Sequence, residues 1–317
     1  AVDDDARSRF AGVRLDVERN VRMVDRFLHD TGPDAAEDTP TGRRYFTDFS
    51  VAGHWLLAEH QIDGADALIP GTGFVELARA AYAEATPAAQ GKAIELRQVT
   101  FLNPFQVGPE QHRRMQIDVE TGAGATAITL RSASSHETHM TAEAALCDTT
   151  PPTCDLTELR ARCRHEIALR DGFLDQDFVR FGPRWQNIES IHLGEREALI
   201  ALALRDAYAG DLGVLAYHPA LMDMATGAAQ YLIPGFNQAT DFLVPFGYDR
   251  IRLHAPVTQR LFSHVRLQAG STADIATFDV SLFDAFGTLL IDIEGFTMKR
   301  VDAGSGIVHK APATAGT

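Results

Sequence analysis

The sequence contains little cysteine and no long apolar run. Its three cysteines, Cys147, Cys154 and Cys163, are odd in number and include no CxxC pair, which argues against a disulfide framework and against a zinc site. No apolar segment approaches the ~18 residues that a membrane-spanning helix needs, and the acidic start AVDDDARSRF is not a secretory signal peptide. We therefore expect a protein of the reducing cytoplasm with no membrane partner.

Basic residues are also in deficit. There are 29 lysines and arginines against 43 aspartates and glutamates, which gives a formal net charge of −14. Non-specific nucleic-acid binding depends on basic side chains that neutralise phosphates, so this balance excludes it as the main function. The hydrophobic fraction of 45% and the charged fraction of 23% over 317 residues are ordinary globular values, and the length suits about two domains.

The two ends of the sequence resemble linker segments. The chain begins without methionine and closes on AGSGIVHKAPATAGT, a run of small residues that is typical of a linker. Residues 14–29 space apolar side chains as an amphipathic helix does, and residues 31–42 are rich in turn formers. We expect a piece of a longer chain that starts with a lead-in helix and a loop.

The same order of elements is expected twice. In the first half, the pattern predicts a strand at 43–51, a helix at 70–85 and successive strands between 91 and 147. A proline-containing connection at 148–160 follows. One long helix among sequential strands is typical of α+β proteins and not of a doubly wound parallel sheet.

The second half repeats this order after a turn-rich stretch at 171–186. Strands are expected at 189–195 and 197–204, then a helix over 217–233, and further strands between 242 and 301. The two halves share an architecture, although they do not align residue by residue.

One cluster of residues that could support chemistry surrounds His60. This histidine lies ten residues before a glycine-rich helix start, Pro70-Gly71-Thr72-Gly73. An imidazole can act as a base near neutral pH, and free N–H groups at a helix N-terminus can polarise a carbonyl. A histidine beside a turn is equally compatible with a structural role, so this cluster alone leaves both interpretations open.

A second cluster is His218-Pro219-Ala220-Leu221-Met222-Asp223. Asp223 lies in an otherwise apolar run, where desolvation is expected to raise its pKa and to make it suitable as a general acid. An aspartate near a helix start is also favoured by the helix dipole, and His218 could be a cap or a turn residue. On these residues alone, the structural interpretation stays open.

Several separated motifs together resemble the polyketide synthase dehydratase family. The segment from His60 through Gly64 to Pro70 resembles its HxxxGxxxxP signature, and the segment that ends at Asp223 resembles its second motif. Residues 181–185 (FGPRW) resemble its YGPxF element. The LVPF segment at 243–246 and the FDAFG to EGF segment at 283–296 resemble its LPF element and its closing hairpin. The motifs follow the family's order and cover roughly residues 43–301.

The resemblance implies a double-hotdog fold, an α+β architecture in which two antiparallel sheets each wrap a central helix. We expect an N-terminal hotdog at 43–147 and a C-terminal hotdog at 165–302. The connecting segments are then 1–42, 148–164 and 303–317. The resemblance also implies neighbouring synthase domains and a homodimer, because the family assembles in dimeric multidomain enzymes.

The resemblance further implies a hydro-lyase that acts in polyketide biosynthesis on a 3-hydroxyacyl thioester carried by an acyl carrier protein. His60 would remove the C2 proton, an N–H at the start of the 70–85 helix would polarise the carbonyl, and Asp223 would protonate the departing hydroxyl. No cofactor or metal of its own is implied, since the carrier's phosphopantetheine arm holds the substrate. The resemblance marks further substrate-binding or oxyanion positions: Gly71, Thr72, Gly73, Phe181, Gly182, Pro183, Trp185, His218, Gly227, Leu243, Pro245 and Phe246.

The sequence departs from the family pattern at four positions. One extra residue precedes Pro70, Phe181 replaces Tyr, Trp185 replaces Phe, and Gly227 stands where Gln or His is common. The last change could reorient Asp223 or widen the pocket. Two alternatives to simple dehydration therefore stay open: an isomerase or ring-forming (pyran or furan) cyclase with the same residues, and a catalytically silent acyl-binding module.

Two expectations concern the surroundings of this site. Apolar side chains are expected to line the pocket mouth, or else to be plain core: Phe181, Trp185, Leu243, Pro245 and Phe246. An acidic carrier protein requires a local basic patch on a chain of such negative charge. Arg180 and Arg184, which flank Phe181-Gly182-Pro183, are the first candidates for that patch.

Overall fold

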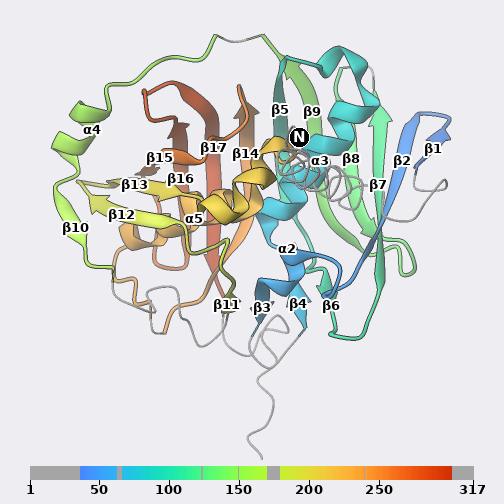
Figure 1. The fold of residues 1–317 in the computed structure, drawn as a ribbon, viewed down its shortest axis with the longest axis horizontal. Coiled ribbons are helices and arrows are strands. Elements are labelled where there is room, and N and C mark those ends of the chain that lie inside the picture. Colours follow the sequence, from blue (N-terminus) through green and yellow to red (C-terminus); the bar gives the residue numbers. More distant parts are fainter. Residues whose placement is uncertain are drawn as a thin grey trace, which may run out of the picture.

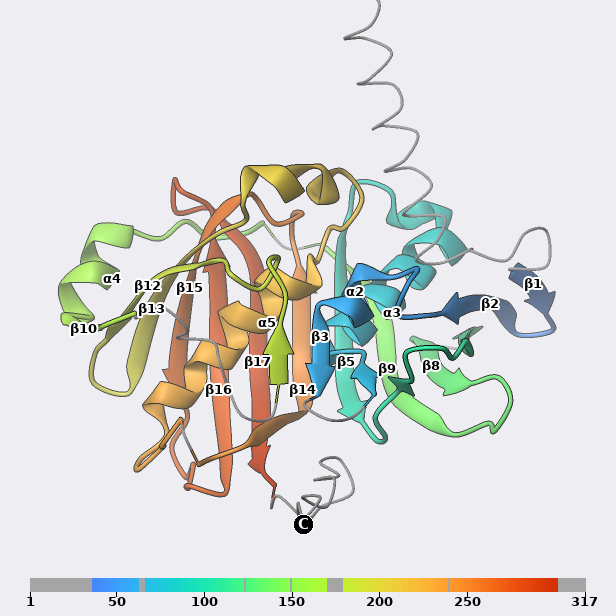
Figure 2. The ribbon, with the colours of Figure 1, turned by 60° about the horizontal axis from the view of Figure 1, so that its bottom comes forward.

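The computed structural model describes residues 36–62, 66–122, 124–148, 150–169, 179–238 and 240–301. Within these residues, thirteen strands form one continuous antiparallel sheet (Figure 1). The two longest α-helices of the described residues, α3 (Gly71–Ala85) and α5 (Pro219–Gly227), lie on the same side of it (Figure 2). The expected helix at 14–29 lies outside the described residues.

The first half of the chain supplies α3 and the strands that it packs on. Pro70 precedes the helix, and Phe74, Leu77 and Ala78 are among the residues it buries against β2, β5, β7, β8 and β9. The elements of this half are β1 (Ala36–Thr39), β2 (Gly42–Phe49), α2 (Trp55–Ala58), η1 (Pro87–Ala89), β5 (Ala93–Phe101), β7 (Arg113–Thr121), β8 (Thr126–Ser132) and β9 (Thr138–Cys147).

The second half repeats the arrangement around α5, whose apolar side chains Ala220, Leu221 and Met222 are buried. This helix packs on β13 and β15. The elements are α4 (Leu156–Arg162), β10 (His165–Ile167), β12 (Ile188–Leu193), β13 (Glu197–Ala203), η2 (Asp206–Gly213), η3 (Ala228–Leu232), β14 (Leu243–Leu253), β15 (Arg260–Leu267), β16 (Ile275–Phe283) and β17 (Leu289–Arg300).

The two halves join edge to edge where β5 pairs with β14. Leu96 and Ile251 are partners in this register, and both are buried. On the neighbouring residues, the guanidinium of Arg252 donates to Glu95 from 2.7 Å. A charge-assisted hydrogen bond thus spans the junction beside its apolar core, and neither half has a free edge there (Figure 1).

A second, smaller sheet brings distant segments together beside the helices. Its order is β11 (Val179–Phe181), β3 (His60–Ile62), β4 (Ala67–Leu68) and β6 (Gln106–Val107). Phe181 of the second half is the register partner of His60 of the first half. This pairing places residues more than a hundred positions apart in one site.

The structure corrects three expectations about elements. Residues 36–39 form strand β1, which pairs with β2 in a hairpin, where a loop was expected over 31–42; the strand expected at 43–51 is found as β2. Strand β1 has the sequence AEDT, which contains no alternation of apolar residues. The connection between the halves contains helix α4, capped by Asp155, which accepts from the Thr157 N–H at 2.7 Å.

The third correction concerns α5, which ends at Gly227 and passes into the 3₁₀ turn η3, so the expected helix over 217–233 is too long. Elsewhere the expected elements agree well with the structure: the helix at 70–85 and the strands at 113–121 and 289–300 are found. None of the helices in the described ranges has both the length and the hydropathy of a membrane span.

Candidate active site

His60 occupies the start of β3, immediately after the short helix α2. Its Nδ1 lies 2.8 Å from the carbonyl oxygen of Leu68 on β4. A carbonyl only accepts, so Nδ1 carries the hydrogen and the neutral ring keeps its lone pair on Nε2. The β3–β4 hairpin therefore sets the tautomer that a base requires, with the free nitrogen directed away from the hairpin.

Asp223 faces that nitrogen from the middle of α5. Its Oδ2 is 4.0 Å from Nε2 of His60, which is too long for a hydrogen bond. The same Oδ2 accepts a hydrogen bond of 2.8 Å from the indole Nε1 of Trp185. His60 and Asp223, which are 163 positions apart in the sequence, thus lie close together, while their catalytic roles stay a prediction.

Burial acts on both members of this pair. Desolvation lowers the pKa of His60, opposed by the nearby Asp223 carboxyl and by the Leu68 carbonyl. Desolvation raises the pKa of Asp223, opposed by His60 and by the Trp185 hydrogen bond. Both changes favour a neutral imidazole beside a protonated carboxyl over an ion pair. A base and an acid in these forms can remove and deliver a proton on adjacent atoms.

The start of α3 lies in the same region and offers backbone donors. The N–H groups of Gly73 and Phe74 both donate to the carbonyl oxygen of Pro70. Within the described parts of the chain, the N–H groups of Gly71 and Thr72 have no acceptor. A Cβ on Gly71 would collide with Phe101 and Pro245, so glycine allows the close packing around this donor.

The Thr72 hydroxyl has a different function. It donates to the carbonyl oxygen of Pro219, 3.0 Å away, and the side chain is buried. This bond links the first turn of α3 to the first turn of α5, and α3 and α5 also contact each other directly. The hydroxyl therefore holds the two helices in register, and the two halves of the site with them.

The FGPRW segment packs closely on the residues before His60. The Gly182 N–H donates to the Glu59 carbonyl from 2.8 Å, and a Cβ on Gly182 would overlap the Glu59 side chain. Pro183 continues the turn to Trp185. The aromatic rings of Phe181 and Trp185 both lie against the His60 ring, with centroids 5.6 Å apart in each case.

The structure corrects the expectation that Arg184 is a surface residue for docking. Its guanidinium donates to Asp211 from 2.7 Å and to Glu59, and it stacks on the rings of Trp55 and Tyr208. Only 13% of its side chain is exposed. Two carboxylates and two rings therefore hold this arginine inside the protein, whereas Arg180 is exposed.

His218 is fully buried at the N-cap of α5. Its Nδ1 accepts from the Leu221 N–H at 3.3 Å, so Nε2 carries the hydrogen that faces Asp211, 3.4 Å away. Burial alone would raise the pKa of Asp211, yet hydrogen bonds from His218 and Arg184 lower it. The histidine caps the helix that holds Asp223 and is itself stacked on Trp55, with centroids 5.5 Å apart.

The other residues that were expected at the pocket mouth differ in how deeply they are buried. Leu243 is buried, Pro245 lies beside Gly71, and Phe246 is 51% exposed. Trp185 is completely buried, so it contacts His60 as part of the core and does not form a pocket mouth. Among the described residues, a Cβ on Gly227 would stand in open space beside its own helix.

Sequence reasoning missed three features of this region. Glu59 and Asp211 hold Arg184, and the Trp185 indole binds Asp223. The only signal for Glu59 is its position next to His60. Nothing near Asp211 in the sequence points to the site, because η2 is brought there by folding alone.

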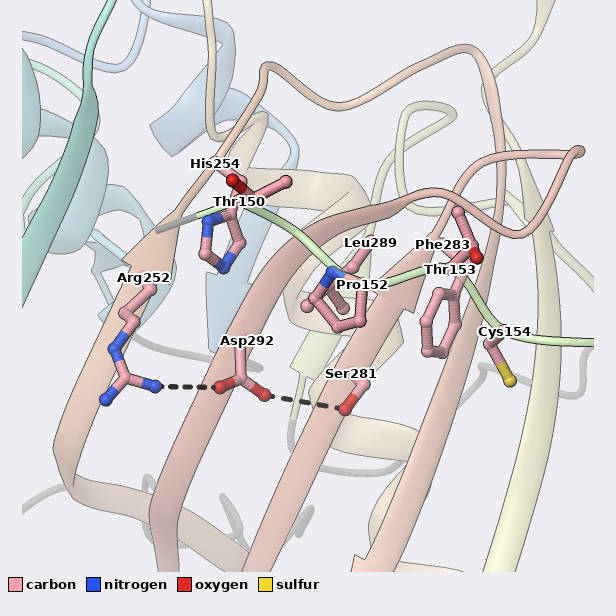
Figure 3. A pocket seen from close by; sticks show the side chains of 10 residues that line it. All are labelled: Thr150, Pro152, Thr153, Cys154, Arg252, His254, Ser281, Phe283, Leu289 and Asp292. Atoms are coloured by element: carbon pink, nitrogen blue, oxygen red, sulfur yellow. Dashed lines mark hydrogen bonds and ion pairs between the residues drawn. The ribbon is translucent and has the colours of Figure 1, made fainter. Parts of the chain in front are cut away.

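A separate groove lies under the connection between the halves, over β14, β16 and β17 (Figure 3). Residues Thr150, Pro152, Thr153 and Cys154 of the connection form one wall. On the floor, Asp292 accepts hydrogen bonds from Arg252 at 3.1 Å and from Ser281 at 3.5 Å. Asp292 is thus paired with its neighbours on the floor, and the groove is separate from the His60–Asp223 pair.

Family models match both halves of the chain. Residues 29–133 match the family model described as polyketide synthase dehydratase domain, and residues 151–306 match polyketide synthase dehydratase N-terminal domain. The chain is 22% identical to polyketide synthase PksM and 25% identical to PksN, both of Bacillus subtilis. The matches cover 84% and 82% of this chain but 7% and 5% of those proteins.

Solved structures show the same fold. A trans-AT polyketide synthase dehydratase domain from Brevibacillus brevis superposes with a TM-score of 0.77 at 22% identity, over 87% of this chain and 98% of that one. The dehydratase domain of the CurF module of curacin polyketide synthase gives 0.75 at 20% identity, over 83% and 95%. The fold is the double hotdog, and with both family models matched in order, the chain belongs to the polyketide synthase dehydratase domain family.

Proposed function

We propose that this domain eliminates water from a 3-hydroxyacyl thioester borne on the phosphopantetheine arm of an acyl carrier protein, and so forms an enoyl thioester. The observation that carries the proposal is the 4.0 Å approach of His60 Nε2 to Asp223 Oδ2. The two groups come from different halves of the chain, and burial drives both toward their neutral forms. A neutral base beside a neutral acid is the starting state for elimination.

In this mechanism, Nε2 of His60 takes the C2 proton of the substrate while negative charge develops on the thioester oxygen. The Gly71 N–H at the start of α3 is the donor we assign to that oxygen, because it has no acceptor among the described residues and lies at the positive end of the helix dipole. Asp223 gives its proton to the C3 hydroxyl, and the C–O bond breaks to release water. A proton then passes from the imidazolium to the carboxylate and restores the pair.

The direct test is to incubate the domain with a 3-hydroxyacyl carrier or pantetheine thioester and to follow the product by mass spectrometry and NMR. Loss of one water with an enoyl product supports the proposal. A shifted double bond or a closed oxygen ring would identify the isomerase or cyclase instead. No change in a folded protein that still binds the carrier-borne chain would identify a silent acyl-binding module.

The proposal predicts a bell-shaped dependence of kcat/KM on pH. The low-pH limb follows protonation of His60 and should lie below the ordinary imidazole value near 6.5, because burial lowers this pKa. The high-pH limb follows ionisation of Asp223 and should lie above the ordinary 3.8, because burial raises it. Since the groups are adjacent, the two limbs belong to the pair. The residual activity of Asp223→Asn should lack the high-pH limb, and a limb retained in that variant would contradict the assignment.

The carrier protein is expected to contact Arg180, which is exposed on β11 beside the site. Arg180→Glu should slow turnover of the carrier-bound substrate, more so at low salt. It should leave turnover of the free pantetheine substrate nearly unchanged. Arg160→Glu on α4, also exposed, is the matched charge-reversal control. Equal losses with both substrates would mean that Arg180 acts on the pocket or the fold.

We also propose that this domain is part of a larger assembly. The curated relatives are polyketide synthases of which the matched region is a small fraction, which supports neighbouring synthase domains as partners. A homodimer is proposed from the family resemblance alone, and sedimentation of the isolated domain would test it.

A further inference from the structure

We propose that Trp185 is a positioning residue for the acid: its indole N–H holds one carboxyl oxygen of Asp223, which leaves the other oxygen to carry the proton for the substrate. This inference rests on the proposed function, in which Asp223 is the acid. It gives Trp185 a role other than substrate contact, in agreement with its complete burial.

The hydrogen bond determines which oxygen is protonated. An indole N–H donates and never accepts, so Oδ2 must be the acceptor at 2.8 Å. The carbonyl-type oxygen of a neutral carboxyl is the better acceptor, and the proton therefore resides on Oδ1. Trp185 bonds Oδ2, and no described residue makes a hydrogen bond to Asp223 Oδ1. That oxygen is available to a substrate hydroxyl, while Oδ2 stays beside His60.

The indole is held rigidly before any substrate arrives. Its ring centroid lies 5.8 Å from that of Trp55 and 6.2 Å from that of Phe181. The backbone N–H of Trp185 donates to the Gly182 carbonyl from 3.1 Å. The Trp185 side chain therefore packs on His60 and binds Asp223. Because its rotamer is already fixed, it does not have to be ordered during the reaction. A supporting residue of this kind keeps a site in productive geometry.

Position 227 offers a second route to the same carboxyl, and so a rescue. Gly227 lies four residues after Asp223 on α5, with ordinary helical φ of −63° and ψ of −35°. Its Cβ position is open. Long side chains on helices lean toward the N-terminus and meet the residue four positions earlier. A glutamine at 227 would therefore place an amide donor near Asp223.

The test starts from Trp185→Phe, which keeps an aromatic ring and removes the donor. We expect kcat to fall roughly 10- to 100-fold, the rate equivalent of one hydrogen bond to a charged group, with KM little changed. The high-pH limb of kcat/KM should move to higher pH, because the carboxylate loses a donor that favours it. Trp185→Phe with Gly227→Gln should recover part of kcat and move the limb back.

A folded Trp185→Phe variant with the wild-type kcat and an unmoved limb would overturn the proposal. If that variant does not fold, NMR of the wild-type protein tests the proposal instead. The sequence has two tryptophans, so two indole ¹H–¹⁵N signals are expected, and that of Trp185 should titrate at the pH of the high-pH limb. The Trp55 signal is the internal control.

If the Trp185 indole signal does not change at the pH where Asp223 ionises, the proposal is also overturned. Failure of the proposed function is distinguishable from this result. In that case the wild-type domain would release no water, although the Trp185 signal still reported the ionisation of Asp223.

Discussion

Substitution of His60 by alanine is expected to lower the rate of water elimination by roughly 10²–10⁴-fold, the usual contribution of general base catalysis. The Leu68 carbonyl fixes the hydrogen on Nδ1, so Nε2 is the nitrogen that takes the proton, and alanine has no equivalent. His60 is buried, so thermal unfolding of the variant must be compared with that of the wild type. The rate is measured as enoyl product formed from a 3-hydroxyacyl pantetheine thioester.

Asp223→Asn should produce a loss of the same order, since an amide occupies the space of the carboxyl but delivers no acidic proton. The two variants also test each other. Because base and acid act in one step, the double variant should be far less impaired than the product of the two single effects. Full activity of Asp223→Asn would show that another group protonates the hydroxyl.

Arg184→Met is expected to destabilise the fold by about 3–5 kcal/mol, the usual cost of breaking a buried ion pair by removing one partner. Methionine keeps much of the apolar stem, but it leaves the carboxylates of Glu59 and Asp211 without their shared cation. Their side chains are only 13% and 7% exposed, so water replaces the arginine poorly. Chemical denaturation of the whole domain, with the midpoint and slope measured together, gives this difference.

A matched control for this prediction is Arg114→Met. Arg114 makes a similar two-bond pair with Asp48, at 2.8 and 2.6 Å, but 47% and 28% of these side chains are exposed. Solvent screening should limit that loss to about 0–1 kcal/mol. Equal losses in the two variants would mean that burial of the Arg184 network does not determine its contribution.

The same network explains why the sequence misassigned Arg184. An arginine next to a proposed entrance, in a chain of net charge −14, is a reasonable candidate for contact with an acidic partner. The carboxylates that neutralise it come from Glu59, which follows α2, and from Asp211 of η2, far apart in the chain. Residue spacing cannot report an ion pair that only the packing of these segments creates.

The function of Trp185 was hidden for a similar reason. In sequence it is an aromatic residue within an apolar motif, which suggests a pocket wall. Its burial and its 2.8 Å bond to Asp223 follow from the way β11 pairs with β3 and from the position of α5. Conversely, no side chain on α5 itself was needed to hold the carboxyl, which is consistent with glycine at 227.

By itself, the sequence determined the elements and the two groups that could perform the chemistry. The spacing of apolar residues predicts α3 and most strands. A helix or strand that buries one face needs apolar residues at regular intervals, and this pattern can be seen in the local sequence. The motifs around His60 and Asp223 can likewise be recognised from the residue types that they contain. Strand β1 was missed because its sequence has no alternation of apolar residues. Helix α4 was missed because it is only seven residues long, too short for its buried Leu159 to belong to a clear helical repeat.

Only the tertiary structure decided how those groups are arranged. The pairing of β5 with β14 and of β3 with β11 brings the two halves together, and the Leu68 carbonyl selects the tautomer of His60. The same folding buries Arg184 and directs an indole at one oxygen of Asp223. Distance, burial and hydrogen-bond partner are properties of pairs that are remote in sequence, so they exist only after the chain has folded.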